Sequence, residues 1–397
     1  MVDYTKEPLW FKIRKVFRYI RLYGWRRTLV KVRGQYHMKK TYDQPPTLKP
    51  NPDGHVGLLG CGNFAYSAIA WYLQKNHGRV LKGVMDVDLN RAMSLAERYQ
   101  AGYFTDDASR IIEDPDIDLV YIASNHATHA EYAIEALAAG KSVHIEKPHV
   151  VSEDQLVRLC GQMTRSKGTV GLGFNRPNSR IGNRIRQYLH EQPGPMMLNW
   201  FVAGHEIDPD HWYFDEQEGG RVLGNLCHWT DFVYRMIPEE NRYPIEINPT
   251  RAERSDCDIA VTYVFGDGSI AIITFSAKGH TFEGVRESFS AHRGNVLMDM
   301  SDFKTLTVEV VDQKHKVSPW YRDHGHQGAI EFSWNAHHKV HPGCSVEYVW
   351  ETAELFLKTR EALEQNRKIT LQPFDARRCP GDATAEPSIS GSSTPVD

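Results

Sequence analysis

A glycine-rich hexapeptide, Gly60-Cys61-Gly62-Asn63-Phe64-Ala65, joins a short apolar run to a helical pattern. The spacing G-x-G-x-x-A between a strand and a helix is typical of turns that bind a dinucleotide pyrophosphate. Gly60 permits the tight turn, Gly62 lets the backbone approach the phosphates, and Ala65 allows close helix–strand packing. We predict a dinucleotide site here that includes Asn63 and Phe64; a glycine turn that packs without a ligand is the alternative.

A carboxylate follows the next apolar run, 81–87, about twenty residues after the glycines. At this place Asp86 can accept both ribose hydroxyls of NAD, and it would repel the 2′-phosphate of NADP. Arg91 lies close enough in sequence to soften that preference. NAD is therefore the expected cofactor, and NADP stays open.

A third segment ends the run Ser142–Ile145 with Glu146, Lys147 and Pro148. Ligands of open α/β sheets bind at the carboxyl ends of the strands. A lysine held there beside a nicotinamide ring can lose solvation, shift its pKa downward and relay a proton. Glu146 would orient Lys147 or the ribose. A surface ion pair at a strand end is the alternative.

These residues need a frame of alternating strands and helices. Apolar runs predict strands at 55–59, 81–87, 118–124, 141–145 and 169–174, with helices at 66–74, 89–99, 127–139 and 153–165. Ser152 and Gln155 have the spacing of a capping box at the start of the last helix. This alternation predicts an α/β fold, with a doubly wound parallel sheet (Rossmann) in an NAD(P)-binding domain over residues 54–176.

The pattern changes over residues 177–375, where we expect a substrate-binding and oligomerisation domain. Val261, Tyr263 and Phe265 alternate before the turn Asp267-Gly268, and alternation resumes from Ile270. Further strands are expected at 286–291, 296–300 and 306–311, and helices at 178–190, 221–237 and 346–364. This is the pattern of an α/β domain with a large, mostly antiparallel, open sheet.

The two ends of the chain differ from the middle. Residues 1–40 carry twelve Lys/Arg and two acids, a charge of +10, so the remainder of this −3 chain carries −13. Within the extension and linker 1–53, Leu9, Ile13 and Ile20 predict an amphipathic helix. It packs on the acidic body or a neighbouring subunit, or it lies on an anionic membrane surface. The Ser/Thr/Pro/Gly-rich stretch 376–397 predicts a disordered tail.

Composition narrows the function classes. An acidic body makes nucleic acid a poor partner. The six cysteines form no CxxC pair, which argues against a zinc or disulfide scaffold and fits a reducing compartment. His337-His338 lack a third ligand at useful spacing, so no metal is predicted. Without a signal-peptide pattern we expect a cytoplasmic protein, with the inner membrane face as the alternative location.

Five segments together resemble the glucose–fructose oxidoreductase/inositol dehydrogenase (Gfo/Idh/MocA) family over residues 54–373. They are Gly60–Ala65, Ser124–His129, Glu146–Pro148, Gly173–Arg176 and Glu218–Asp231. The resemblance implies an NAD(P)-dependent oxidoreductase acting on sugars or cyclitols, as a homo-oligomer (dimer or tetramer) with contacts through its open sheet. Segments such as Asn199–Gly204 and Asp210–Trp212 look closest to a subgroup linked with surface polysaccharides, which suggests sugar-nucleotide substrates.

The resemblance also carries roles over to particular residues. Lys147 and His228 would be catalytic, with His228 exchanging the proton of a hydroxyl and Asp231 either orienting it or capping structure. The cofactor would contact Ser124, Asn125, His126 and His129, and also Glu146, Lys147 and Asn175. The substrate would contact Lys147, Asn175, Arg176, His211, Trp212, Asn225 and His228.

One position departs from the family pattern. Many members carry Asp or Asn four residues before the helix histidine, and this chain has Gly224 there. Two further readings therefore stay open. One is a glycosidase that uses tightly held NAD for transient oxidation, and the other is a dinucleotide-binding sensor or scaffold without catalysis.

Overall fold

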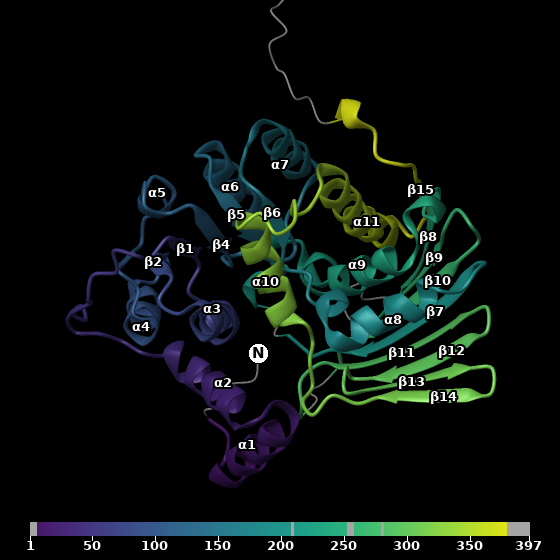
Figure 1. The fold of residues 1–397 in the computed structure, drawn as a ribbon, viewed down its shortest axis with the longest axis horizontal. Coiled ribbons are helices and arrows are strands. Elements are labelled where there is room, and N and C mark those ends of the chain that lie inside the picture. Colours follow the sequence, from purple (N-terminus) through teal and green to yellow (C-terminus); the bar gives the residue numbers. More distant parts are fainter. Residues whose placement is uncertain (1–5, 208–209, 252–257, 279–281, 379–397) are drawn as a thin grey trace, which may run out of the picture.

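The computed structural model describes residues 6–207, 210–251, 258–278 and 282–378. In Figure 1 the parallel sheet and the helices that connect its strands lie at the left and top, and the large second sheet lies at the right. The two N-terminal helices lie at the bottom of the view. The predicted α/β class, with a Rossmann sheet and a mostly antiparallel second sheet, is confirmed.

The first sheet has six parallel strands in the order β3-β2-β1-β4-β5-β6. Leu59 ends β1 and pairs with Met85 on one side and Ile122 on the other. Because the strands end in register, the segments that follow β1, β2, β4 and β5 meet at one edge. The strands are β1 Val56–Leu59, β2 Leu81–Met85, β3 Tyr103–Thr105, β4 Leu119–Ile122, β5 Ser142–Ile145 and β6 Val170–Leu172.

Helices connect these strands, and their ends follow local capping chemistry. Asp88 caps α4 by accepting from the N–H of Asn90, and Ser152 caps α7 by accepting from Gln155, as its spacing predicted. The short β3 and α5 were not predicted, because three or four residues give too little periodicity. The helices are α3 Ala70–His77, α4 Leu89–Tyr99, α5 Ser109–Ile112, α6 His126–Ala138 and α7 Glu153–Arg165.

The second sheet has nine strands in the order β14-β13-β12-β11-β7-β10-β9-β8-β15. Its neighbouring strands pair antiparallel within the described residues, except that β7 and β10 run parallel. The predicted hairpin at Asp267-Gly268 joins β9 to β10, with Gly268 at φ +84°. The strands are β7 Met196–Ala203, β8 Ile245–Arg251, β9 Asp258–Val264, β10 Ile270–Ser276, β11 Arg286–Arg293, β12 Val296–Ser301, β13 Thr305–Val310, β14 Gln313–Val317 and β15 Ile369–Leu371.

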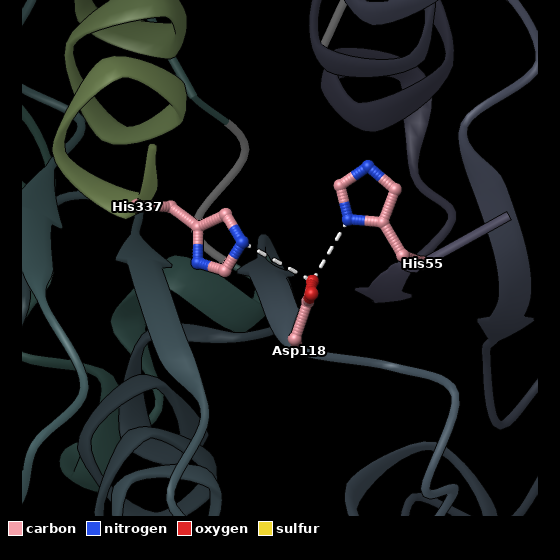
Figure 2. Close-up of side chains that lie close together, drawn as sticks. All are labelled: His55, Asp118 and His337. Carbon is pink, nitrogen blue, oxygen red and sulfur yellow. Dashed lines mark hydrogen bonds and ion pairs between the residues drawn. The ribbon is translucent and has the colours of Figure 1, made fainter. Parts of the chain in front are cut away.

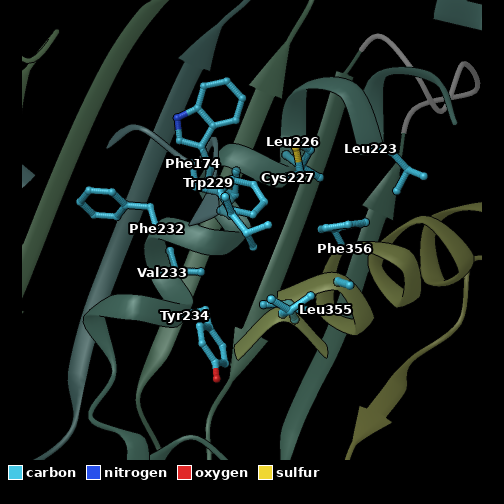
Figure 3. Packing of buried hydrophobic residues seen from close by; sticks show 14 of the residues in the cluster. Phe174, Leu223, Leu226, Cys227, Trp229, Phe232, Val233, Tyr234, Leu355 and Phe356 are labelled. Atoms are coloured by element: carbon cyan, nitrogen blue, oxygen red, sulfur yellow. The ribbon is translucent and has the colours of Figure 1, made fainter. Parts of the chain in front are cut away.

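One face of this sheet is covered and the other is open. The covered face packs Trp200 and Phe289 against Phe232, under α8 Arg180–His190, α9 Cys227–Met236 and α11 Val346–Gln365. Figure 3 shows the adjoining core, where side chains of α9 and α11 interdigitate. On the open face Met197 and Phe201 are about half exposed.

Helix α10, His326–His337, was not predicted and links the two domains. It comes from the second half of the chain but packs on β5, β6 and α3 of the first sheet. A Cβ on Gly171 of β6 would lie 2.0 Å from the hydroxyl oxygen of Ser333, so glycine is needed for this contact. The two halves of the chain are therefore tied together beside the cofactor edge.

The N-terminal extension forms two helices, α1 Leu9–Tyr23 and α2 Trp25–His37, of which only the first was predicted. On the second domain, Arg18 of α1 pairs with Glu283, and the Phe11 and Phe282 rings meet edge to face. On the first domain, His37 of α2 bonds to the Cys61 carbonyl and stacks on Tyr66. The extension thus packs on the chain's own body and spans both domains.

The structure describes only the first residues of the predicted C-terminal tail. Within the expected tail, Ala376–Arg378 form a short 3-10 helix, and residues 379–397 lie outside the described part. Among the helices in the described ranges, none is both long and apolar enough to cross a bilayer.

Candidate functional site

The glycine turn has the geometry that a pyrophosphate site requires. Gly60 has φ +89°, and a Cβ there would lie 2.5 Å from the Ala123 carbonyl oxygen. A Cβ on Gly62 would meet nothing within 4 Å, so the backbone is approachable. The side-chain oxygen of Asn63 is buried without a hydrogen-bond partner among the described residues. These features fit a dinucleotide, although the following helix starts as a π-turn, η1 Ala65–Ile69, rather than an α-helix.

Asp86 lies beside this turn at the end of β2. It is 7% exposed, and its two oxygens accept from the backbone N–H groups of Cys61 at 2.7 Å and Asp88 at 2.9 Å. Each oxygen keeps a second lone pair, which is what a ribose hydroxyl needs. Arg91 pairs with Asp88 at 3.3 Å, so its charge is already engaged.

Lys147 crosses from the first domain to the second. Its Nζ donates to the carbonyl oxygen of Gly224 at 2.8 Å, one helical turn before His228. Burial by itself lowers the pKa of Lys147, but Tyr213, Cys227 and Glu146 outweigh it and hold the pKa above its usual value. The downward shift expected from the sequence was wrong, because anionic and polar neighbours surround the buried amine. Lys147 is therefore a charged hydrogen-bond donor.

His228 lies where π-helix η5, Val222–Leu226, passes into α9. Its Nδ1 is buried and has no hydrogen-bond partner in the described residues. Burial, reinforced by Arg176 and Lys147, lowers the pKa of His228 well below its usual value. The imidazole is therefore neutral, with a ring nitrogen left for a ligand, and the nearby side-chain oxygen of Asn225 is likewise unpartnered.

Comparisons with known proteins agree with this geometry. Residues 55–174 match a profile described as an oxidoreductase family with an NAD-binding Rossmann fold. The uncharacterized oxidoreductase YrbE of Bacillus subtilis is 26% identical over 274 residues, which cover 67% of this chain and 80% of that protein. Inositol 2-dehydrogenase of Acidothermus cellulolyticus is 28% identical over 183 residues, which cover 41% of this chain and 54% of that protein.

A solved structure shows the same fold over most of both chains. Levoglucosan dehydrogenase in complex with NADH aligns with a TM-score of 0.70 and 18% identity, over 81% of this chain and 100% of that one. Over residues 55–174 the chain has the NAD-binding domain of the Gfo/Idh/MocA oxidoreductase family. It is an NAD(P)-dependent oxidoreductase with an NAD-binding Rossmann domain.

The glycine that departs from the common Gfo/Idh/MocA pattern has a steric reason here. A Cβ on Gly224 would lie 2.3 Å from Cε1 of Tyr213 and 2.7 Å from Cε1 of His126. The Tyr213 hydroxyl donates at 3.0 Å to the same Gly224 carbonyl that Lys147 contacts. Tyr213 therefore occupies the space that a side chain at position 224 would need, and its hydroxyl lies beside Lys147.

Two histidines of α6 have different surroundings. His126 contacts the Glu218 carbonyl at 2.9 Å and packs against the rings of Trp212 and Tyr213. Burial first, and Lys147 second, lower the pKa of His126 to about 2. His129 places its ring nitrogens 2.8 Å from the Pro148 carbonyl and 3.1 Å from that of Ser124. His129 thus holds the loop that carries Lys147, whereas His126 joins the two domains.

The segment after β6 is held by the second domain. Arg176 pairs with Glu287 at 2.5 Å and lies over the ring of Trp229, while Asn175 donates to the His324 carbonyl at 2.6 Å. Arg176 and Asn175 thus join the substrate side of the site with His324. Glu287, Asp302 and His324 place their potential ligand atoms close enough together to hold a metal ion. However, Arg176 pairs with Glu287 and Arg322 pairs with Asp302, so both carboxylates already have a cationic partner.

The remaining predicted residues have local roles. Glu146 contacts His144 at 3.2 Å and packs on Gly173. His211 caps the 3-10 turn η3, Trp212–Phe214, which carries Tyr213. Asp231 accepts a hydrogen bond from Tyr348 of α11 at 2.5 Å. This contact favours a structural role for Asp231 over the orientation of His228.

Sequence reasoning missed Tyr213, Glu287, His324 and His326. Tyr213 directly follows Trp212 and could have been noted from that adjacency. The histidines flank Gly325 before α10, but with 19 histidines in the chain their spacing alone carried no signal. Glu287 lies on a strand 111 residues from Arg176, and no local pattern predicts their contact.

A separate cluster lies at the opposite edge of the sheet. Figure 2 shows His55 and His337 both directed at Asp118, whose Oδ1 lies 2.8 Å and 3.3 Å from their ring nitrogens. The sequence indicated no third ligand near His337; the fold supplies two potential ones, from segments far apart in the chain. Because His55 and Asp118 precede β1 and β4, this cluster is remote from the cofactor edge, and it fastens α10 to the first domain.

Proposed function

We propose that this protein transfers hydride between a nicotinamide and a hydroxyl-bearing carbon of a sugar or cyclitol. One observation carries the proposal: Lys147, at the cofactor edge of the Rossmann sheet, donates to the carbonyl one turn before His228. The two residues thereby belong to one site between the domains. The inositol 2-dehydrogenases among its relatives support this substrate class by name.

The residues present fit NAD at this edge. Gly60 to Ala65 would hold the pyrophosphate, Asp86 the adenosine ribose, and Ser124, Asn125, His126 and Glu146 the nicotinamide half, with Asn175 near the amide. His129, whose two ring nitrogens are engaged by backbone carbonyls, would support this half from behind. Bound NAD supplies the hydride acceptor or donor. The open space beside Gly62 and the unpartnered Asn63 oxygen support this placement.

The chain's own groups handle the proton. The charged Lys147 donates a hydrogen bond to the reacting oxygen and favours its alkoxide form. His228, neutral in its cationic surroundings, accepts the hydroxyl proton; in the reverse direction the same surroundings make its protonated form a strong acid. Arg176, Asn225, His211 and Trp212 would line the substrate side.

The test is turnover of a panel with purified protein and NAD: myo-inositol, free sugars, and UDP- and GDP-sugars, monitored by nicotinamide absorbance. We expect NADH to form with at least one compound, and the His228→Asn variant to bind NADH normally while losing at least about a hundredfold in kcat. Release of a free sugar from a glycoside without net NADH would instead establish redox-assisted hydrolysis. Equal rates for His228→Asn and wild type would remove His228 from the mechanism.

We further infer a homo-oligomer that uses the open face of the nine-stranded sheet. Met197, Phe201 and Leu297 are about half exposed there, which is unusual for large apolar side chains in a sheet. Light scattering should give a mass of at least two chains, and Phe201→Lys should reduce it. A monomeric wild type would contradict this.

Contact of α1 with an anionic membrane stays a second proposal. Leu9, Trp10 and Phe17 are 72%, 69% and 65% exposed on a helix that also carries several basic side chains. The test is co-sedimentation with vesicles containing phosphatidylglycerol; binding should fall in Trp10→Ser/Phe17→Ser. A role in surface-polysaccharide synthesis rests on the sequence resemblance and would gain support from turnover of a sugar nucleotide.

A further inference from the structure

A cavity of about 400 Å³ lies between α2, α3 and the loop that leads into α10. Its lining combines two chemical classes. The cationic residues are Arg26, Arg27, Lys31, Lys75 and Arg322, and the aromatic residues are Tyr23, Trp25, Trp71, Tyr72 and Tyr321. Asp323 is the carboxylate in this lining, and its oxygens accept from the backbone N–H groups of Gly325 and Arg180.

The cavity adjoins residues of the candidate site. His324 and His326 line it, and the side-chain amide of Asn175 lies 2.6 Å from the His324 carbonyl oxygen and 3.5 Å from His326 Nε2. The ring of His326 also lies 5.3 Å from that of Phe64 in the glycine turn. His324 and His326 thus contact both the cavity and residues predicted for the site, and a ligand that reached past His326 would approach Asn175 and Phe64.

Lys31 is the most informative residue in this lining. Its Nζ lies 4.8 Å from the centre of the Tyr23 ring, and no carboxylate pairs with it among the described residues. Burial, together with the charges of Arg27 and Arg322, lowers the pKa of Lys31 to about 7. A buried cation without an anion is costly, and a bound anion would reverse that cost.

The other cations differ in how far they are already neutralised. Arg322 pairs with both Glu283 and Asp302, so it serves the packing of the extension. Arg27 donates to the Ser67 carbonyl and lies over the Tyr72 ring, with no carboxylate partner in the residues described. Arg27 thus offers a positive charge to a ligand, and Lys31 would become fully protonated when an anion binds beside it.

Aromatic rings lie at the outer side of the cavity. Trp25 is 61% exposed and Tyr321 is 52% exposed, although both line it. Exposed rings beside cations are the arrangement on which a nucleobase stacks while its phosphates meet the charges. A cavity of this size falls in the range of small-molecule sites, about 300 to 1,000 Å³.

We propose that this cavity binds the nucleoside diphosphate part of a sugar-nucleotide substrate. Lys31 and Arg27 contact the diphosphate, the base stacks at Trp25 or Tyr321, and the sugar extends past His326 to Lys147 and His228. The N-terminal extension is then part of the substrate site. This inference rests on the proposed function, because it assigns the substrate class of that same site.

The experiment is a calorimetric titration of UDP into full-length protein saturated with NADH. Saturation fills the Rossmann site, so UDP that binds does so elsewhere. We expect binding that weakens with salt and that weakens at least about tenfold in Lys31→Gln and in Arg27→Gln, since each loses a charge-assisted hydrogen bond. Arg14→Gln removes an exposed charge from the same extension outside the cavity and should bind UDP as the wild type does.

NADH affinity and circular dichroism of each variant report whether the fold is intact. Should Lys31→Gln fail to fold, Trp25→Ala, at an exposed position, should weaken UDP binding about threefold or more. The proposal is overturned if NADH-saturated protein does not bind UDP, if NADH displaces UDP, or if folded Lys31→Gln and Arg27→Gln bind it normally. Oxidation of inositol or a free sugar without UDP binding would refute this inference alone. UDP binding without any turnover would keep the subsite and refute the proposed function.

Discussion

The two walls of the candidate site meet at the carbonyl of Gly224 but are assembled differently. The proposed cofactor wall consists of the glycine turn, Asp86 and the Glu146–Lys147 segment, at the carboxyl ends of β1, β2 and β5 of one parallel sheet. The substrate wall consists of Tyr213, Gly224 to His228, Glu287 and His324 to His326, which come from four separate segments. Strand register positions the first wall, whereas side-chain contacts position the second.

This difference affects how each wall responds to change. In the cofactor wall the groups that matter are backbone N–H groups, the Asp86 carboxylate and one lysine, so most other substitutions nearby leave the frame intact. In the substrate wall each side chain is held by another, as Arg176 is by Glu287 and Trp229. We therefore expect the effect of Lys147 substitution in the first wall to be independent of its neighbours, and the effects of substitutions in the second wall to be coupled to one another.

The largest effect is expected from Lys147→Met. In the proposed mechanism the variant loses the charge that stabilises the developing alkoxide, and kcat should fall by about a thousandfold. NADH affinity should change by no more than about threefold, because the glycine turn and Asp86 are untouched. Steady-state kinetics and NADH fluorescence titration measure the two quantities. Comparable losses of kcat and affinity would show that Lys147 mainly holds the cofactor.

Gly224→Ala should cost about tenfold to a hundredfold in kcat. The added methyl would overlap Tyr213 and His126, and displacement of a catalytic wall by a fraction of an ångström is enough for such a loss. Thermal unfolding should show a decrease of about 1–3 kcal/mol in stability. Combining it with Tyr213→Ala should recover part of that stability, since the overlapping ring is gone. Additive losses in the double variant would contradict the steric account.

Tyr213→Phe distinguishes packing from proton transfer on the substrate wall. The ring that excludes a side chain at position 224 stays, and only the hydrogen bond to the Gly224 carbonyl is lost. We expect kcat to fall about tenfold or less, the value of one neutral hydrogen bond. A loss as large as that of Lys147→Met would assign the reacting proton to Tyr213 instead of His228. Comparing kcat of Tyr213→Phe and Lys147→Met with the same substrate therefore decides whether Tyr213 transfers the proton.

The two walls also differ in how far the sequence predicts them. The glycine turn, Asp86 and Lys147 each follow an apolar run whose end is clear in the sequence. The predicted helices 89–99 and 153–165 match α4 and α7. Local periodicity suffices because each of these residues needs only its own strand end. The Rossmann sheet was accordingly predicted with most of its elements.

The substrate wall depends on contacts that no local pattern contains. Gly224 departed from the family pattern for no reason visible in sequence, and the reason is a ring eleven residues away in the chain. The helices α2 and α10 were missed because basic and histidine-rich faces weaken the apolar periodicity. Both bring residues of distant segments to the cavity beside the candidate site, namely Lys31 and His326.

The smallest expected effect on kcat is that of Asp231→Asn. Asp231 lies on the same helix as His228, but its side chain accepts a hydrogen bond from Tyr348 of α11. Burial raises the pKa of Asp231 to about 6. A carboxyl whose folded pKa is raised binds its proton more tightly in the native state, so its contribution to stability is full below pH about 4 and is lost as pH rises through about 6. Asp231→Asn should therefore flatten the decline of the unfolding free energy across that window, by up to about 3 kcal/mol.

Burial also raises the pKa of Asp302 to about 6, so some decline remains in the variant. Unfolding measured by denaturant between pH 4 and 7, against Asp106→Asn at an exposed site as the control, tests this. The pH dependence of kcat should be the same in Asp231→Asn and wild type, because Asp231 contacts Tyr348 and not His228. A shifted kcat profile with an unchanged stability profile would instead place Asp231 on the substrate wall, as a residue that orients His228.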